Sequence, residues 1–285
     1  MKPPKRLQPL IEDGLVDEVL SQLMSGKEAT VYMVRCGNEI RCAKVYKEAS
    51  QRSFKQAVTY QEGRKTKNSR RQRAMDKSSK FGRKQQENVW QDAEVGALYR
   101  LAEVGVRVPA PYGCFDGVLL MELVTDDQGQ VAPRLNDISM SADKAREGHA
   151  EIMNFVKLML CAGLIHGDLS EFNVLVGNLG PVIIDLPQAV NAAANNSAEA
   201  MLSRDVQNMN SYYGMFAPDL LETKYDKEMW ALYERGKLTP DTKLTGQFLE
   251  NQKEANVDSV LLEIKEAYKE EQQRLSRIQG LDKPE

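Results

Sequence analysis

The chain has 285 residues, and its 38 Lys and Arg nearly balance its 41 Asp and Glu. This length predicts one large domain or two lobes with a shared interface, and a core that needs no disulfide or metal to hold it. The near-neutral charge gives no whole-chain preference for nucleic acid or membrane. The four cysteines form no zinc-type spacing, which indicates reduced thiols and a cytoplasmic protein. No apolar run approaches a transmembrane span, so no membrane partner is expected.

The first elements predicted are a short lead-in helix and a turn that runs into a strand. Apolar residues recur through 10–20, and an alternating strand follows the turn at Ser25, Gly26 and Lys27. A glycine turn with exposed N–H groups can lie over phosphates, although a plain hairpin turn has the same composition. The turn matches neither the G-x-G-x-x-G pattern nor the Walker A pattern.

A lysine interrupts the next predicted strand, which covers residues 41–46. Lys44 is either a buried, phosphate-binding lysine that needs a carboxylate partner or a lysine on a solvent-facing side of the strand. Residues 90–101 have helical spacing, with Glu94 at the edge of the apolar face. Glu94 is therefore a candidate partner for Lys44, although spacing alone favours a solvated glutamate.

The segment between these two elements has an unusual composition. Residues 52–87 are rich in Lys and Arg and poor in apolar residues, which predicts a mobile basic loop or a weak helix. Such a segment can bind RNA or a ribonucleoprotein through phosphate contacts. A solvated insertion explains it as well, and the shortage of aromatic residues slightly favours that alternative.

The middle of the chain predicts a strand, a connector and a long helix. Residues 118–124 form an apolar strand that leads into a polar connector at 125–130, and residues 141–163 have helical periodicity. The connector joins two lobes and can offer backbone groups to an adenine ring. His166 follows the helix and is expected to be a packed structural histidine.

The most informative stretch is the run from His166 to Asp185. A loop carries Asp168 and Asn173, and two short apolar strands that turn at 177–180 end at Asp185. The hairpin brings Asp185 back beside the loop. A carboxylate that accepts a proton, with an amide oxygen and a second carboxylate that bind Mg²⁺, is the arrangement that phosphoryl transfer needs. The alternative is that all three are ordinary turn residues and strand ends.

The last third of the chain predicts helices. A helix covers the region from Met201 to Tyr213, and Asp205 within it is expected to accept N–H bonds from the loop at Asp168. The tail from Lys224 onward is predicted to be helical, with a break at 238–241. A heptad-like stripe after residue 257 is expected to pack on the second lobe rather than form a coiled coil.

Six stretches together resemble the RIO family of atypical serine/threonine protein kinases. The residues that carry the resemblance are Ser-Gly-Lys-Glu-Ala-Thr-Val-Tyr (25–32), Ala-Lys-Val-Tyr-Lys (43–47), Leu-Leu-Met-Glu (119–122), His-Gly-Asp-Leu-Ser-Glu-Phe-Asn-Val-Leu-Val (166–176), Ile-Asp-Leu-Pro-Gln-Ala-Val (184–190) and Arg-Asp-Val-Gln-Asn (204–208). The implied fold is α+β, a two-lobed protein-kinase-like fold that is trimmed of the activation loop and the peptide-binding subdomains. The expected boundaries are an N-lobe at 1–124, a C-lobe at 125–222 and a helical C-terminal extension at 223–285.

The resemblance implies ATP and Mg²⁺ as cofactors, with Mn²⁺ as a substitute, and it implies the role of each site residue. The residues that would bind the nucleotide are Ser25, Gly26 and Lys27 in the phosphate loop, Lys44 with its partner Glu94, and Met121, Glu122 and Val124 around the adenine. Asp168 would be the catalytic base, and Asn173 and Asp185 would bind the metal. Asp185 would also be catalytic if it accepted the phosphoryl group.

Two departures from ordinary kinases stand out. Gly167 replaces their arginine and cannot bind an activation-loop phosphate, so that form of control is not expected, and Leu186-Pro187 replaces their Phe-Gly. About 20 residues precede the phosphate loop, too few for the winged-helix domain of one branch of the family, so a member of the bacterial type is expected.

Four functions remain in competition. The first is a serine/threonine kinase that phosphorylates itself and a protein substrate of unknown identity. The second is an ATPase switch that forms an aspartyl-phosphate at Asp185 and acts on a ribonucleoprotein. A small-molecule phosphotransferase and a non-enzymatic scaffold are the third and fourth.

Overall fold

The computed structural model describes residues 3–26, 28–47 and 93–248. Lys27, the basic segment 52–87 and the heptad-like stripe of the tail lie outside the described residues. Contacts divide the chain into a unit of residues 1–247 and a second unit of residues 248–285. The first unit holds every element described below.

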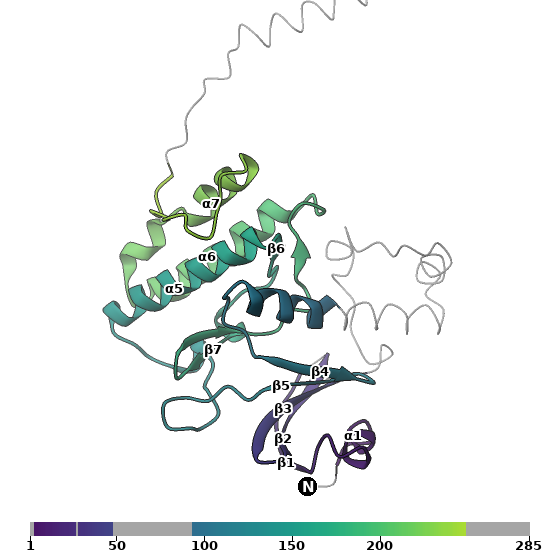
Figure 1. Cartoon of the computed structure of the whole chain (residues 1–285). Helices are drawn as coiled ribbons and strands as arrows, with labels where there is room; N and C mark the ends of the chain where they lie inside the picture. Colours follow the sequence, from purple (N-terminus) through teal and green to yellow (C-terminus); the bar gives the residue numbers. More distant parts are fainter. Residues whose placement is uncertain (1–2, 27, 48–92, 249–285) are drawn as a thin grey trace, which may run out of the picture. The chain divides into compact units, whose positions relative to one another are not determined.

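A twisted antiparallel sheet forms the N-terminal part of this unit (Figure 1). Its five strands lie in the order β1-β2-β3-β5-β4. Their bounds are β1 Glu18–Ser25, β2 Ala29–Cys36, β3 Glu39–Tyr46, β4 Pro111–Phe115 and β5 Val118–Glu122. The strands predicted at 41–46 and 118–124 are therefore confirmed, and Cys42 pairs with Met33 across the β2–β3 hairpin rather than with Cys36.

The predicted lead-in helix is only half correct. Helix α1 covers Gln8–Glu12, and the chain is already in strand β1 at Glu18. Gly14 takes a φ of 71° just after the helix, a left-handed conformation that ends helices and suits glycine. The apolar residues after it belong to the strand, where Val19 packs with Leu10 of α1 against one face of the sheet.

The opposite face of the sheet meets a larger core, which is mostly helical. A helix over 93–103 contributes Ala97, Leu98 and Leu101 to this core. Two long helices follow, α5 Ala142–Cys161 and α6 Ala198–Gly214, and they lie side by side in Figure 1. Helix α5 begins where the Ser141 hydroxyl accepts a hydrogen bond from the Lys144 N–H at 3.3 Å, as an N-cap does.

Short elements precede and connect the two long helices. They are η2 Leu135–Asp137 just before α5, then β6 Leu164–Ile165, η3 Glu171–Asn173, β7 Val174–Gly177, β8 Gly180–Ile183 and β9 Val190–Asn191. Strands β7 and β8 form the predicted hairpin, which turns between Gly177 and Gly180. Only residues 186–197 separate Asp185 from α6, so the chain has no room there for a long activation loop.

The predicted helical tail is confirmed over residues 225–234 and at its break over 238–241, and it is wrong over 235–237 and 242–248. After η4 Pro218–Glu222, helix α7 covers Tyr225–Glu234, and the described residues that follow are not helical. Gly236 adopts a φ of 63° and Pro240 cannot continue a helix, so the chain turns earlier than its periodicity predicts. Helix α7 belongs to the first unit, so that unit extends beyond residue 222; the proposed domain boundaries are otherwise a prediction.

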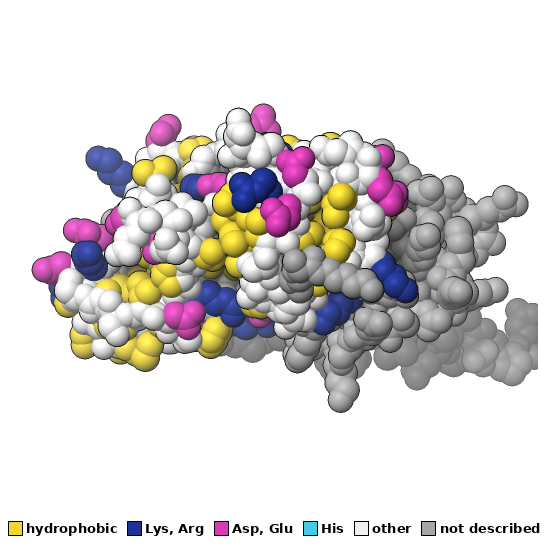
Figure 2. Space-filling model, turned by 90° about the horizontal axis from the view of Figure 1, so that it is seen from below, with side chains coloured by type: hydrophobic (Ala, Val, Ile, Leu, Met, Phe, Trp, Pro, Cys, Tyr) yellow, Lys and Arg dark blue, Asp and Glu magenta, His cyan; other side chains and the backbone are white. Residues whose placement is uncertain are grey.

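The surface of the sheet side is mixed in character. Figure 2 shows apolar side chains interspersed with basic and acidic ones, and no histidine appears on this face. Both histidines, His149 and His166, are buried elsewhere. Across the described ranges, no helix combines the length and the apolar character that crossing a bilayer requires.

Candidate active site

Lys44 lies at the centre of the site, between the sheet and the helical part. Strand residues alternate between the two faces of a sheet, so Lys44 shares the inner face with Tyr46 while Ala43 and Val45 pack on the outer face. The Lys44 ammonium donates hydrogen bonds to Glu94 Oε1 at 2.6 Å and to Asp185 Oδ1 at 2.9 Å. The solvent-facing alternative for Lys44 is wrong, because the residue is only 8% exposed.

The charges in this cluster stabilise one another. Burial alone lowers the pKa of Lys44, but the negative charges of Asp185 and Glu94 outweigh it and raise that pKa well above its usual value. The positive charge of Lys44 in turn lowers the pKa of Asp185. The Tyr46 hydroxyl donates to Glu94 Oε2 at 2.5 Å, so both oxygens of a glutamate that is 2% exposed have donors. Lys44 and Asp185 are therefore both charged at neutral pH.

His166 ties the loop of Asp168 to the end of strand β8. Its Nε2 lies 3.0 Å from the carbonyl oxygen of Ile184, and its Nδ1 lies 3.3 Å from the backbone nitrogen of Asp168. A carbonyl can only accept, so Nε2 carries the hydrogen and Nδ1 accepts from Asp168. The predicted structural histidine is confirmed, and it fixes the distance between Asp168 and Asp185.

Helix α6 holds the same loop through its backbone. Asp205 accepts hydrogen bonds from the N–H groups of Gly167 at 2.8 Å and Leu169 at 2.9 Å, which confirms the support predicted for it. Arg204 donates to the Gly167 carbonyl, and Asn208 donates to the Leu169 carbonyl at 2.9 Å. Gly167 has a φ of 82°, a conformation that arginine would adopt only with strain, and this explains the glycine at that position.

Asp168 projects from this held loop and is itself exposed. Partial burial raises the pKa of its carboxyl group, against the opposing effects of His166 and Arg204. The Gln188 amide donates to Asp168 Oδ2 at 3.3 Å. A carboxylate that is positioned at its backbone and has a raised pKa is suited to accept a proton from a hydroxyl group.

Asn173 and Asp185 flank the β7–β8 hairpin: Asn173 ends η3 just before β7, and Asp185 follows the end of β8. The Ile184 N–H donates to the Asn173 carbonyl at 2.9 Å, and the Asn173 amide nitrogen donates to the Asp168 carbonyl at 2.8 Å. The Asn173 amide oxygen is thus directed away from the loop. Asp185 has a φ of 68°, which aspartate tolerates better than most residues.

The Asn173 amide oxygen and the Asp185 carboxylate fit Mg²⁺, which prefers hard oxygen ligands and commonly binds through one or two carboxylates plus phosphates. Among the described residues, no group of three or more His, Cys, Asp or Glu side chains could hold a metal alone. A magnesium ion here would therefore depend on phosphate oxygens for the rest of its coordination.

The end of strand β5 carries the residues predicted to contact adenine. Met121 lies opposite Cys42 of β3 and packs against the main core. Val124 is buried, and its carbonyl accepts from the Ala132 N–H at 3.0 Å. The Val124 N–H has no acceptor among the described residues, so it is available to a purine nitrogen.

The Glu122 side chain has a role that the sequence did not predict. Arg107 donates to its two carboxylate oxygens at 2.8 and 2.5 Å, and these hydrogen bonds lower the pKa of Glu122. The Arg107 carbonyl also accepts from the Ile183 N–H of β8 at 2.9 Å. Arg107 therefore joins the end of β5 to the hairpin that precedes Asp185.

The predicted phosphate loop is the turn of the β1–β2 hairpin. The Lys47 ammonium donates to the Gly26 carbonyl at 2.6 Å and to the Ser25 hydroxyl at 3.3 Å. Arg134, just before η2, contacts the Met24 sulfur at the end of β1, and its charge also lowers the pKa of Asp185. The turn therefore lies on the same side of the sheet end as Asp185.

Sequence reasoning missed three side chains of this site. Arg107 and Arg134 lie in stretches without periodicity or motif, and their partners are distant in sequence. Gln188 lies within the 184–190 stretch, but the sequence assigns it no role. No signal in a single sequence identifies Arg107 or Arg134. Gln188 lies three residues after Asp185, so its proximity to the site could have been inferred.

The chain matches a known protein family. The model of the RIO domain matches residues 30–227. The chain is 31% identical over 207 residues to the RIO-type serine/threonine-protein kinase Rio1 of Haloferax volcanii, a match that covers 72% of this chain and 66% of the relative. It is 30% identical over 206 residues to the human serine/threonine-protein kinase RIO1, with 72% and 34% covered. The chain thus spans between a third and two thirds of the length of these relatives.

A solved structure shows the fold. The Rio2 kinase of Chaetomium thermophilum, crystallised as an ADP/Mg²⁺-phosphoaspartate complex, matches with a TM-score of 0.54 at 20% identity, over 81% of this chain and 74% of that one. The predicted trimmed, two-lobed kinase-like fold is confirmed. The chain belongs to the RIO family of serine/threonine protein kinases.

Proposed function

We propose that the protein is an ATP-dependent serine/threonine kinase that also phosphorylates itself. The observation that carries the proposal is the Lys44 ammonium, which bonds both Glu94 at 2.6 Å and Asp185 at 2.9 Å. A kinase needs a lysine held by a helical glutamate beside a metal-binding aspartate. Here all three groups meet from separate parts of the chain.

The nucleotide would lie between the turn at Ser25–Gly26 and the β7–β8 hairpin. Lys44 would bind its phosphates, and the backbone around Val124 would bind its adenine. Asn173 and Asp185 would hold Mg²⁺, which would neutralise the phosphate charge as the phosphoryl group leaves. Lys27 would contribute to the phosphate loop and lies outside the described residues.

Asp168 would act on the hydroxyl that receives the phosphoryl group. As the serine or threonine oxygen bonds to the γ-phosphorus and the bond to the ADP oxygen breaks, the hydroxyl proton would pass to the Asp168 carboxylate. The contacts of Asp205 with Gly167 and Leu169 support this role, because they fix the loop in position without using the Asp168 carboxylate.

The second candidate is an ATPase that forms an aspartyl-phosphate at Asp185. The related Rio2 structure, solved as a phosphoaspartate complex, supports this candidate. In such a cycle an Asp185 oxygen would attack the γ-phosphorus and release ADP, and water would then hydrolyse the acyl phosphate to aspartate and phosphate. The side chain of Asp185 is 45% exposed, so water could reach it.

The experiment that separates the two candidates follows the label from γ-labelled ATP and Mg²⁺. Acid-stable label on serine or threonine supports the kinase, and label at Asp185 that hydroxylamine removes supports the ATPase. Asp168→Asn should slow transfer to a hydroxyl by roughly 10²–10⁴-fold. The control is Lys144→Met, since Lys144 is exposed on α5. The absence of both labels from the wild-type chain would refute both candidates, and unchanged transfer to a hydroxyl in Asp168→Asn would refute the role of Asp168.

The binding partners of the chain are proposed from its sequence alone. A protein substrate is expected for a kinase, and the basic segment 52–87 is proposed to contact RNA or a ribonucleoprotein. Deletion of residues 64–84 should then abolish salt-sensitive RNA binding and leave self-phosphorylation intact. RNA binding that survives the deletion would contradict this role.

A further inference from the structure

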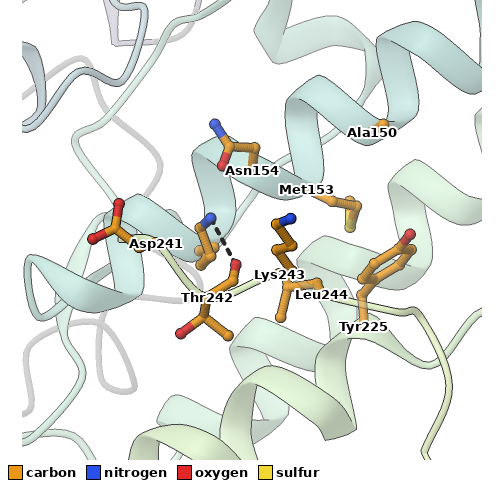
Figure 3. A pocket seen from close by; sticks show the side chains of 9 residues that line it. Ala150, Met153, Asn154, Tyr225, Asp241, Thr242, Lys243 and Leu244 are labelled. Atoms are coloured by element: carbon orange, nitrogen blue, oxygen red, sulfur yellow. Dashed lines mark hydrogen bonds between the residues drawn. The ribbon is translucent and has the colours of Figure 1, made fainter. Parts of the chain in front are cut away.

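A cavity of about 400 Å³ lies in the helical part of the chain, between α5, α7 and the segment that follows α7. Figure 3 shows Ala150, Met153 and Asn154 of α5 on one side and Tyr225 of α7 on the other. Residues 241–244 complete the lining, together with Lys157. None of these residues belongs to the site around Lys44.

Hydrogen bonds hold the wall of this cavity in place. The Glu228 carboxylate of α7 accepts from the N–H groups of Thr245 at 2.9 Å and Gly246 at 2.8 Å. The Gly246 carbonyl accepts from the Lys224 N–H at 2.7 Å. The segment is thus held at the first turn of α7 by both Lys224 and Glu228, and the cavity is preformed, as binding sites for small ligands usually are.

The unusual group in the lining is Lys157. This lysine is 7% exposed, and its ammonium has one hydrogen-bond partner among the described residues, the Thr242 carbonyl at 3.0 Å. An ammonium has three N–H donors, and a buried charge without a counter-charge is costly. No carboxylate within the described residues forms an ion pair with it. Two donors and one positive charge are therefore left for another molecule.

The rest of the lining indicates what that molecule is like. Lys243 and Asp241 are both exposed and carry opposite charges, so with Lys157 the lining holds two positive charges and one negative charge. Asp241 lies at the opposite end of the lining from Tyr225 (Figure 3). Met153, Leu244 and the Tyr225 ring offer apolar surface. A volume of this size accommodates a small organic molecule rather than a folded partner.

We propose that this cavity binds a small organic anion. Its phosphate or carboxylate group would accept hydrogen bonds from Lys157, and its apolar body would lie against Met153, Tyr225 and Leu244. The ligand would join α5 to the segment after α7, so its binding would also stabilise the folded chain. The proposal does not depend on the proposed kinase activity, because the cavity shares no residue with that site.

The test is a titration of the full chain with phenyl phosphate, benzoate and benzyl alcohol. Binding is monitored by NMR through the signals of ¹³C-methyl-labelled methionines. The Met153 signal reports on the cavity, and the Met121 signal reports separately on the nucleotide site. Phenyl phosphate and benzoate distinguish a phosphate ligand from a carboxylate ligand. Benzyl alcohol has the same ring without a charge. The variants are Lys157→Met and, as a control on the same helix, Lys144→Met.

We expect at least one of the two anions to shift the Met153 signal in a saturable way. Lys157→Met should weaken that binding about tenfold or more, since hydrogen bonds to a charged group are the strong ones, and Lys144→Met should leave it unchanged. Melting temperatures show whether each variant is folded. A Met153 signal that no anion moves would overturn the proposal. So would equal binding in folded Lys157→Met, or equal binding of benzyl alcohol.

Discussion

Two buried lysines show how differently the same charge can be accommodated. Lys44 on strand β3 and Lys157 on helix α5 are 8% and 7% exposed. Lys44 has two carboxylate partners from distant parts of the chain, whereas Lys157 has one neutral carbonyl. The first lysine is compensated within the fold, and the second is left with capacity for a ligand. The burial of a lysine therefore says little about its function. Its hydrogen-bond and ion-pair partners are more informative.

The largest expected effect comes from removing the compensated charge. Lys44→Met leaves the buried Glu94 without its cation, and breaking a buried pair costs about 3–5 kcal/mol. Denaturant unfolding of the variant should show a loss of this size, and phosphoryl transfer should also fail. The exposed Lys144→Met should change neither. A Lys44→Met loss below about 1 kcal/mol would mean that the cluster is not stabilising.

Asp205 is a third buried charge, and its partners are backbone N–H groups. Its contribution to the free energy of unfolding should depend on pH. Burial raises its pKa from 3.8 to about 6, so the folded chain binds this proton more tightly than the unfolded chain. This group therefore adds stability as the pH falls through 6, and the gain is complete below about 4. The total gain in the free energy of unfolding, measured relative to Asp205→Asn, is about 3 kcal/mol.

The measurement is the difference in unfolding free energy between wild type and Asp205→Asn at several pH values from 4 to 7.5. Subtraction cancels the titration of all other groups. A difference that stays constant, or that grows in favour of wild type as the pH rises, would contradict a raised pKa for Asp205.

A smaller loss of stability is expected when the Tyr46 hydroxyl of the Lys44 cluster is removed. Tyr46→Phe removes the donor to Glu94 Oε2, and a buried acceptor left unsatisfied costs about 1–3 kcal/mol. Tyr99→Phe, at an exposed position of the helix over 93–103, is the matched control. Equal stability of both variants would show that Glu94 depends on Lys44 alone.

The smallest effect should come from the uncompensated lysine. Lys157→Met removes a buried charge together with one hydrogen bond to a neutral carbonyl, so the two changes oppose each other. Its free energy of unfolding should stay within about 1 kcal/mol of wild type in the absence of ligand. A loss as large as that of Lys44→Met would mean that Lys157 has a structural partner, and the contrast between the two lysines would fail.

The sequence by itself determined the local elements and the motif around the loop. Alternating and helical periodicity identified β3, β5, the β7–β8 hairpin and α5, because these patterns depend only on neighbouring residues. The hairpin was enough to bring Asp185 near Asp168 and Asn173. Periodicity failed after Glu12 and after Glu234, where a glycine with positive φ follows each helix before the apolar pattern ends.

Only the tertiary structure decided which charges meet. A strand pattern cannot tell a buried lysine from an exposed one, so the burial of Lys44 depended on the helix over 93–103 packing on that face. The contacts of Arg107 with Glu122 and of Arg134 with Met24 join residues far apart in the chain. The cavity beside Lys157 depends in the same way on where α7 and the segment after it pack. Contacts between distant segments are set by packing, which a single sequence does not encode in any local pattern.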